Sequence, residues 1–204
     1  MELICGTGNQ AKLTFMREAL AGLDIQIIGL IELGQPVPSV PETGASPLDN
    51  ARIKALAYFR AFGKPVFSCD SGLYFDGLAD ELQPGVHVRT VNGRTLTDEE
   101  MIAYYGGMAK QHGDLKARYK NAICLVLDEA HIFESMADDL SGNTFLLTSL
   151  PHSKRVQGFP LDSISVHIPT GQHYYDLMEQ PADDIVQRAG FRRFFETVLS
   201  EIGA

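Results

Sequence analysis

The sequence lacks both a long hydrophobic run and an excess of basic residues. No stretch of its 204 residues approaches the roughly 20 apolar residues of a membrane-spanning helix. The formal net charge of -9 argues against nucleic acid or an anionic membrane as a general partner. These absences still allow a small anion in a local basic pocket, or a metal ion held by carboxylates.

Cysteine is also scarce, and it is not arranged for metal binding. Cys5, Cys69 and Cys124 all stand in apolar, strand-like stretches without metal-ligand spacing. An odd number of such thiols is typical of reduced, buried cysteines in the cytoplasm. The six histidines show no HExxH or similar zinc spacing. The start, "MELIC", has an acid where a signal peptide would carry basic residues. We therefore expect a cytoplasmic protein without zinc.

The organisation of the chain predicts one domain over residues 1–204. Hydrophobic residues make up 45% and charged residues 21%, as in ordinary globular proteins, and we find no internal repeat. Strands and helices alternate early, and long strands follow. The fold class predicted is α/β, with an elongated, mixed central sheet and flanking helices. Helices are expected over 11–22, 48–63, 97–107 and near the C-terminus, and strands over 3–5, 24–30 and 64–69. Residues 117–142 are expected to form two long strands joined by a turn around Asp128 and Glu129.

The first candidate site is the loop "GTGNQAK" (6–12), which joins the first strand to the first helix. Two glycines let the backbone approach a phosphate, and the helix N-terminus offers free N–H groups. Lys12 adds a full positive charge. The same letters also satisfy a dinucleotide fingerprint, for which Glu32 is the acid near the end of the second strand. A third interpretation is a tight turn with a solvated lysine.

Two acids form the next candidates. Glu42 stands in "VPETG" (40–44), within a stretch with four prolines (34–47) that we expect to be irregular. Asp70 follows the buried strand in "FSCDSG" (67–72), where a carboxylate can coordinate a hard cation or polarise water. The alternatives are a solvent-facing glutamate and an ordinary turn at the end of a strand.

Taken in order, these pieces resemble the inosine triphosphate pyrophosphatase family. The ordered set is "TGNQAK", "PETG", a helix with "NA" and "KA", then "DSGL" and "PGVHVR". The likeness covers residues 2–90 well and continues more loosely through "ARYKNAICLVL" (117–127) and "GFPLDS" (158–163). The opening loop is therefore interpreted as a triphosphate loop. The dinucleotide alternative is set aside because we expect no further parallel βαβ run after Glu32.

The resemblance implies an enzyme of two lobes around a nucleotide cleft. Such enzymes use Mg²⁺ to cleave a nucleoside triphosphate to monophosphate and pyrophosphate, and they act on deaminated purines such as inosine and xanthosine triphosphates. Asp70 would be catalytic, Glu42 and Asp70 would bind Mg²⁺, and Ser71 would touch the substrate. The phosphates would be held by Thr7, Gly8, Asn9, Gln10, Ala11 and Lys12.

The half that would recognise the base departs from the family. Cys69 replaces the first of two adjacent acids, and the family's late lysine has no counterpart. Where the family has G-F-G-Y-D-P with a stacking tyrosine, the candidates are Phe159, Pro160, Leu161 and Asp162. Where it has S-H-R, this chain has Val186-Gln187-Arg188, so Gln187 replaces the histidine and only the arginine is kept. A leucine cannot stack as an aromatic ring does, so we expect weaker purine selectivity.

The partners expected are a nucleoside triphosphate and a second copy of the chain, since the resemblance implies a homodimer. No nucleic acid polymer and no membrane is expected. Two other functions stay open. One is the same chemistry on a different base or on another pyrophosphate substrate. The other is a nucleotide-binding homologue without catalytic activity.

Overall fold

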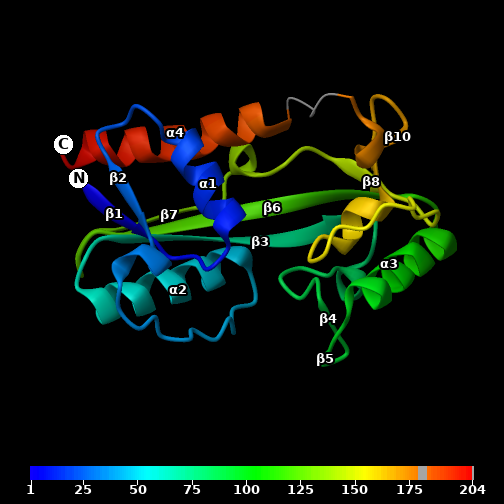
Figure 1. Ribbon diagram of the computed structural model, residues 1–204, viewed down its shortest axis with the longest axis horizontal. Coiled ribbons are helices and arrows are strands. Elements are labelled where there is room, and N and C mark those ends of the chain that lie inside the picture. Colours follow the sequence, from blue (N-terminus) through cyan, green and yellow to red (C-terminus); the bar gives the residue numbers. More distant parts are fainter. Residues whose placement is uncertain (179–182, 204) are drawn as a thin grey trace. The chain divides into compact units, whose positions relative to one another are not determined.

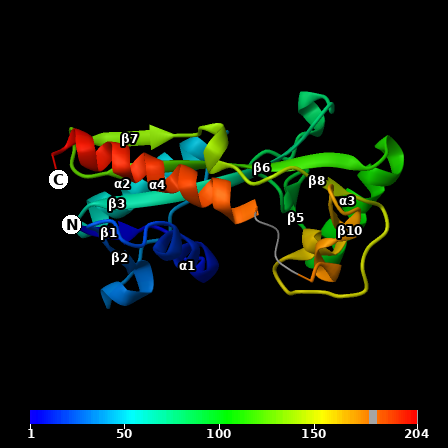
Figure 2. The same cartoon turned by 90° about the horizontal axis from the view of Figure 1, so that it is seen from above.

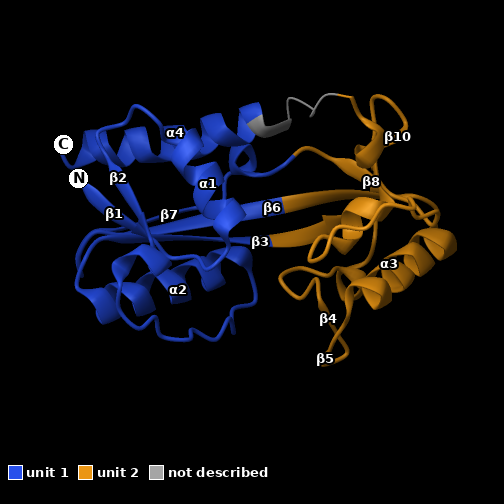
Figure 3. Ribbon diagram, viewed as in Figure 1, with its two compact units in different colours: residues 1–71, 120–142, 184–204 blue, residues 72–119, 143–183 orange. Residues whose placement is uncertain are grey.

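The computed structural model describes residues 1–178 and 183–203, and the chain divides into two compact units (Figure 3). Unit 1 comprises residues 1–71, 120–142 and 184–204, and unit 2 comprises residues 72–119 and 143–183. Two long strands, β3 (Val66–Phe75) and β6 (Leu115–Val126), contribute residues to both units.

Unit 1 is a mixed sheet with helices on both faces. Its remaining strands and its helices are β1 (Glu2–Cys5), α1 (Gln10–Ala19), β2 (Gln26–Gly29), α2 (Pro47–Phe62), β7 (Ile132–Ser135) and α4 (Asp183–Glu201). β1 lies between β2 and β3 and is parallel to both, whereas β7 runs antiparallel to β6.

The alternation of side chains along β1 explains the layers of unit 1. Leu3 and Cys5 point to one face and Ile4 to the other, and all three are buried. The first face is covered by α1 and α4 and the second by α2, as Figure 1 shows. Figure 2 shows α4 running beside β7. Helical residues of the first face are Leu13, Met16, Phe191 and Phe195, and those of the second are Ala51, Ala55 and Tyr58.

Helix α2 begins and ends where its sequence dictates. The Ser46 hydroxyl accepts a hydrogen bond from the Asp49 amide, and the Asp49 carboxylate accepts one from the Ser46 amide. Pro47 takes the first helical position, where no amide hydrogen is needed. The helix ends at Gly63, whose φ of 63° is in the left-handed region.

Unit 2 is built around α3 (Asp98–His112), which starts with a second capping box between Thr97 and Glu100. Its short strands are β4 (Thr90–Val91), β5 (Arg94–Thr95), β8 (Phe145–Leu147), β9 (Ser165–His167) and β10 (Gln172–His173). The core joins α3 to the ends of β3 and β6, to β8 and to the turn at 160–164; it includes Leu73, Phe75, Tyr105, Leu147, Leu161 and Ile164.

Short 3₁₀ helices complete the described chain. They span Leu30–Leu33, Asp80–Leu82, Asp138–Leu140, Pro160–Ile164 and Tyr174–Asp176. Among the helices of the described residues, none combines the length and the apolar character that crossing a bilayer requires.

The predicted α/β class with a mixed sheet and flanking helices is confirmed, as are the helices over 48–63 and after Thr97. The irregular stretch predicted over 34–47 is confirmed for residues 34–46, and Pro47 is the first residue of α2. The predicted break of the strand at 70–72 is wrong, because β3 continues to Phe75. Leu73 and Phe75 are buried in unit 2, and their apolar side chains favour the longer strand.

The expectation that parallel strands stop after Glu32 is also wrong. Helix α2 is followed by β3, which pairs in parallel with β1, so the chain does continue with a second βαβ unit. The Glu32 carboxylate is itself engaged by the Arg17 guanidinium and the Gly29 amide, and these contacts lower its pKa. Topology therefore does not distinguish a triphosphate loop from a dinucleotide loop. Glu32, the acid that the dinucleotide interpretation requires, is instead paired with Arg17 of α1.

Two glycines within helices allow a matched test of this packing. A Cβ built on Gly190 of α4 would lie 2.2 Å from the Asp139 carbonyl oxygen, whereas one on Gly107 of α3 meets no atom within 4 Å. We expect Gly190→Ala to lower the free energy of unfolding by about 1–3 kcal/mol, because backbone atoms must move apart. Gly107→Ala should raise it by roughly 0.5–1 kcal/mol, because it removes backbone freedom from the unfolded chain. Urea denaturation measures the free energy of unfolding of both variants. Equal changes in the two would contradict the close contact between α4 and the backbone of Asp139.

Candidate functional site

The loop that follows β1 contains two glycines, of which Gly6 lies against β3 and Gly8 has free space around its Cα. A Cβ on Gly6 would lie 2.1 Å from the Ser68 hydroxyl oxygen, and the Gly6 carbonyl accepts a hydrogen bond of 3.1 Å from that hydroxyl. A Cβ on Gly8 would meet no atom within 4 Å. Gly6 therefore fixes the loop against β3, while the backbone at Gly8 stays accessible to a ligand.

The start of α1 suits an anion. Asn9 caps the helix, since its side-chain oxygen accepts from the amides of Ala11 at 2.9 Å and Lys12 at 3.2 Å. The first turn of α1 contains no acidic residue. The positive end of the helix dipole is thus not balanced by a carboxylate of that turn. Gly8, Asn9, Gln10 and Ala11 are exposed, and Thr7 and Lys12 are half-buried.

Lys12 connects this loop to the middle of β3. Its ammonium lies 3.3 Å from the Ser71 hydroxyl oxygen and donates to it. Ser71 follows Asp70 directly in β3, so Lys12 reaches the strand one residue beyond the predicted metal ligand. The hydroxyl and the ammonium are both donors that a phosphate oxygen can accept.

Asp70 and Glu42 converge on a lysine that the sequence analysis did not single out. The Lys54 ammonium, from α2, lies 2.9 Å from Glu42 Oε1 and 3.3 Å from Asp70 Oδ1. It also donates to the Cys69 carbonyl oxygen at 3.3 Å. Burial favours the neutral amine, but Asp70 and Glu42 outweigh it and raise the pKa of Lys54. Lys54 is therefore a buried cation between two carboxylates.

One signal in the sequence points to Lys54. It stands on the same buried face of α2 as Ala51 and Ala55, where a lysine is unusual unless its charge is paired. The face also carries Asn50, whose side-chain oxygen accepts a hydrogen bond of 2.8 Å from the Gly44 amide. This bond holds the otherwise irregular segment that contains Glu42 against the start of α2.

The position of Asp70 on β3 separates it from Cys69. Asp70 faces α2, where its carboxylate meets Lys54, while the Cys69 side chain lies in the apolar core under α1 and α4. Burial raises the pKa of the Cys69 thiol to about 12. The thiol is therefore a core group, and its carbonyl oxygen is the part of Cys69 that reaches the site.

The donor set of Glu42 and Asp70 fits Mg²⁺. This ion is commonly held by one or two carboxylates, and water and substrate phosphate oxygens complete its octahedral coordination. The Asp70 side chain is 11% exposed and that of Glu42 51% exposed. Within the described residues, no three or more His, Cys, Asp or Glu side chains form a group that could hold a metal ion. The pair therefore suits a metal that arrives with its own oxygen ligands.

The residues predicted for base recognition are found in both units. In unit 2, Leu161 is 4% exposed and packs in the core, whereas Phe159 is 49% exposed and Asp162 is exposed. Pro160 is buried beside Leu161. The ring of Phe159, and not the side chain of Leu161, is thus the apolar group of this segment that a ligand can reach.

Gln187 and Arg188 belong to α4 in unit 1. The Arg188 guanidinium lies 2.8 Å from the Glu18 carboxylate and 4.8 Å from the centre of the Phe15 ring, so it is held against α1. Gln187 is half-buried. These two contacts fix the position of the guanidinium, which keeps further N–H donors that a base could accept.

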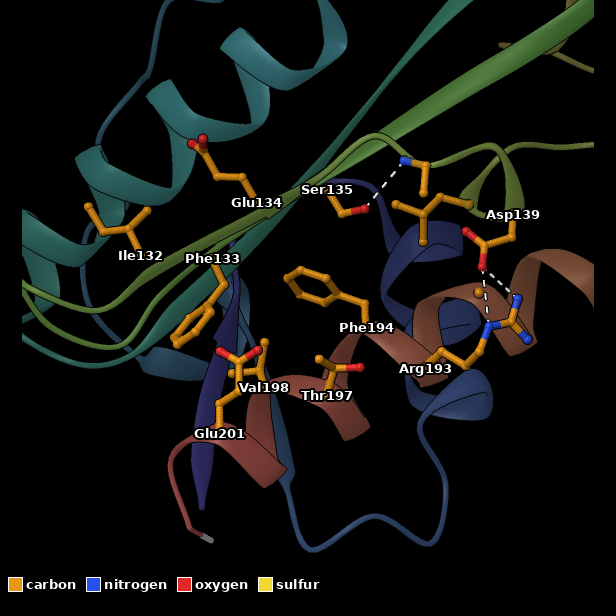
Figure 4. Close-up of a pocket in the computed structure, with 13 residues that line it drawn as sticks. Ile132, Phe133, Glu134, Ser135, Asp139, Arg193, Phe194, Thr197, Val198 and Glu201 are labelled. Atoms are coloured by element: carbon orange, nitrogen blue, oxygen red, sulfur yellow. Dashed lines mark hydrogen bonds and ion pairs between the residues drawn. The ribbon is translucent and has the colours of Figure 1, made fainter.

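A separate groove of about 450 Å³ lies between β7 and α4 (Figure 4). Phe133 and Phe194 face each other across it, and an ion pair between Arg193 and Asp139 closes one side. None of the predicted site residues lines this groove. Its lining mixes apolar side chains with polar ones, and its one basic side chain, Arg193, is paired with Asp139.

The loop that carries Phe159 is anchored through Asp98 of α3. The Asp98 carboxylate accepts a hydrogen bond of 2.8 Å from the Gly158 amide and pairs with the Arg89 guanidinium at 2.8 Å. The amide and the guanidinium lower the pKa of Asp98. Arg89 belongs to the "PGVHVR" motif, so this motif supports the segment at 158–162.

We expect Asp98→Ala to release the Gly158 amide. Because the Thr97–Glu100 capping box is retained, α3 should remain folded while the amide of Gly158 exchanges at least about tenfold faster, as befits a lost charge-assisted hydrogen bond. Hydrogen exchange followed by NMR measures this, and Glu99→Ala, which breaks only the exposed pair with Arg155, is the control. In the unchanged protein, protection should persist below the ordinary pKa of an aspartate and disappear as the pH falls through the lowered one. Unchanged exchange in Asp98→Ala would rule out the anchor.

Comparison with known proteins identifies relatives of the chain. Residues 3–160 match the Ham1 family. A dITP/XTP pyrophosphatase from Anaeromyxobacter dehalogenans is 40% identical over 87 residues, which is 43% of this chain and 36% of that protein. Those from Deinococcus deserti and Symbiobacterium thermophilum are 30% and 38% identical over 69% and 61% of this chain. The matched segments span 64% and 61% of these two relatives, so less than two thirds of each of the three curated relatives is matched.

Solved structures extend the likeness over the whole chain. A HAM1 protein from Coxiella burnetii superposes with a TM-score of 0.76 at 27% identity, covering 98% of this chain and 99% of that one. The Ham1 protein of Staphylococcus aureus has a TM-score of 0.74 at 23% identity over 97% of this chain and 99% of that one, and shares the fold. The family match and these structures agree with the ordered motifs of the sequence, and the chain belongs to the Ham1 family.

Proposed function

We propose that this protein is a nucleoside triphosphate pyrophosphatase that hydrolyses the bond between the α and β phosphates with the aid of Mg²⁺. The observations that carry the proposal are that Glu42 and Asp70 meet at the Lys54 ammonium and that Lys12 contacts Ser71, the residue after Asp70 in β3. A carboxylate for a metal and donors for a phosphate thus occur at consecutive positions of one strand. The names of the curated relatives, dITP/XTP pyrophosphatases, support the same chemistry.

Each residue then has a task in the reaction. Lys12, Ser71 and the loop backbone, which a ligand can approach at Gly8, bind phosphate oxygens and orient the triphosphate. Glu42 and Asp70 would hold Mg²⁺, which when bound neutralises phosphate charge and lowers the pKa of coordinated water. Asp70 accepts the proton of the attacking water, and its place within β3 fixes its orientation. The leaving pyrophosphate keeps its contacts with the loop before Lys12.

The base side supports a purine with an oxygen acceptor, but with modest selectivity. Phe159 offers an exposed ring that can lie against a base, in place of the family's tyrosine two positions later. Arg188 has only donors, so it favours a base that offers an oxygen, while Gln187 can donate or accept and blurs that preference. Inosine and xanthosine triphosphates and their deoxy forms are the proposed substrates.

The setting of the enzyme follows from the same resemblance. We propose that residues 1–204 act as one catalytic domain, because β3 and β6 contribute to both units. A homodimer in the cytoplasm is proposed, and the three cysteines support a reducing compartment because all are buried, free thiols. Light scattering of the purified protein measures the oligomeric state.

Pyrophosphate release from a panel of triphosphates tests the chemistry. We expect turnover with Mg²⁺ and a loss of about 10²-fold or more in Asp70→Asn, because the amide cannot accept the proton. Asp76→Asn is the matched control, since Asp76 pairs with Lys116 at an exposed position of unit 2. Near-normal turnover in Asp70→Asn would remove that residue from the mechanism. Absence of turnover with every triphosphate would favour a nucleotide-binding homologue without catalysis.

The substrate preference is a separate prediction. We expect higher kcat/KM for inosine or xanthosine triphosphate than for adenosine triphosphate, by a narrower margin than a site with the family's full set of polar contacts gives. Phe159→Ala should lower kcat/KM for all three, because stacking does not depend on the base edge. Leu150→Ala, at another exposed apolar position of unit 2, serves as the control. A strong preference for adenosine triphosphate points instead to the same chemistry on a different base.

A further inference from the structure

The Lys54 ammonium is fully engaged by groups of unit 1. It has three N–H donors, and three oxygens surround it: Glu42 Oε1 at 2.9 Å, Asp70 Oδ1 at 3.3 Å and the Cys69 carbonyl at 3.3 Å. The Lys54 side chain is only 11% exposed, as is that of Asp70. The lysine is therefore held in one position in the site and is not a mobile surface charge.

The two carboxylates that Lys54 holds are the same two that fit a metal ion. A divalent cation binding to Glu42 and Asp70 approaches their oxygens much more closely than an ammonium does, at about 2.0–2.1 Å for Mg²⁺. It would also place two positive charges next to the ammonium in a site of restricted solvent access. The ammonium and the metal thus oppose each other through charge and through the oxygens they share.

We propose that Lys54 is an internal counter-ion that competes with the divalent cation for Glu42 and Asp70. The inference rests on the proposed function only in taking these two residues as the metal ligands. In the absence of metal, the lysine neutralises one of the two negative charges and keeps the carboxylates together. The metal gains full access to them only when the ammonium turns to another anion, such as a phosphate oxygen of the arriving substrate. Metal and triphosphate therefore bind better together than either does alone.

Metal binding without nucleotide tests the competition directly. We expect Lys54→Met to bind Mg²⁺ at least about tenfold more tightly than the unchanged protein in calorimetric titrations, because a charge-assisted competitor has been removed. Mg²⁺ should also raise the Tm of Lys54→Met by more than it raises that of the unchanged protein, since the variant leaves two carboxylates unbalanced. Lys64→Met, which breaks an exposed pair with Glu2 in the same unit, is the matched control and should behave like the unchanged protein.

A measurement on the unchanged protein covers the case in which Lys54→Met does not fold. The Lys54 ammonium should give a slowly exchanging signal in ¹⁵N NMR, because it is little exposed, donates to Glu42 and the Cys69 carbonyl, and is ion-paired with Asp70. Saturating Mg²⁺ should shift or broaden that signal while the ammonium signal of Lys64 stays unchanged. A Lys54 signal that Mg²⁺ leaves unaltered overturns the proposal, as does weaker or equal Mg²⁺ binding by Lys54→Met, or an absence of Mg²⁺ binding by both proteins. Because these titrations contain no nucleotide, their failure is distinct from a failure of pyrophosphate release.

Discussion

The fixed alternation of side chains along β3 is the constraint on which the site depends. Successive residues of a strand point to opposite faces, so Phe67 and Cys69 fill the core beneath α1 and α4 while Ser68 and Asp70 face α2. Ser68 holds the loop after β1 through Gly6, and Asp70 meets Lys54. A shift of one residue in register would bury the carboxylate and expose the core. The packing of a hydrophobic strand thus orients the candidate catalytic carboxylate.

Charge balance is the second level of this organisation. A carboxylate as little exposed as that of Asp70 needs a partner, and α2 supplies one from its buried face. The same helix fixes Glu42 through the hydrogen bond between Asn50 and the Gly44 amide. One helix therefore brings the cation and orients the irregular segment that carries the second acid. Local structure, electrostatics and the arrangement of the candidate metal ligands cannot be separated here.

Sequence reasoning predicted the fold class and several helices, because caps and hydrophobic periodicity are local signals, and the ordered motifs indicated the family. It missed Lys54, whose role depends on which face of α2 is buried. It placed Leu161 at a ligand although the side chain packs in a core, since exposure depends on neighbours distant in the chain. The ion pair between Arg188 and Glu18 joins residues far apart in the sequence, so no local pattern predicts it. The length of β3 was missed because a serine and a glycine resemble a turn.

The three thiols have a practical consequence. Cys5, Cys69 and Cys124 are free and buried, and burial raises the pKa of each, so almost no thiolate exists at neutral pH. Alkylating labels react with thiolate and should therefore leave the three native cysteines almost unlabelled. A cysteine introduced at an exposed position in each unit would then be labelled selectively. The protein is thus already suited to fluorescence or spin-label distance measurements between its two units, with no need to remove a native cysteine from the core.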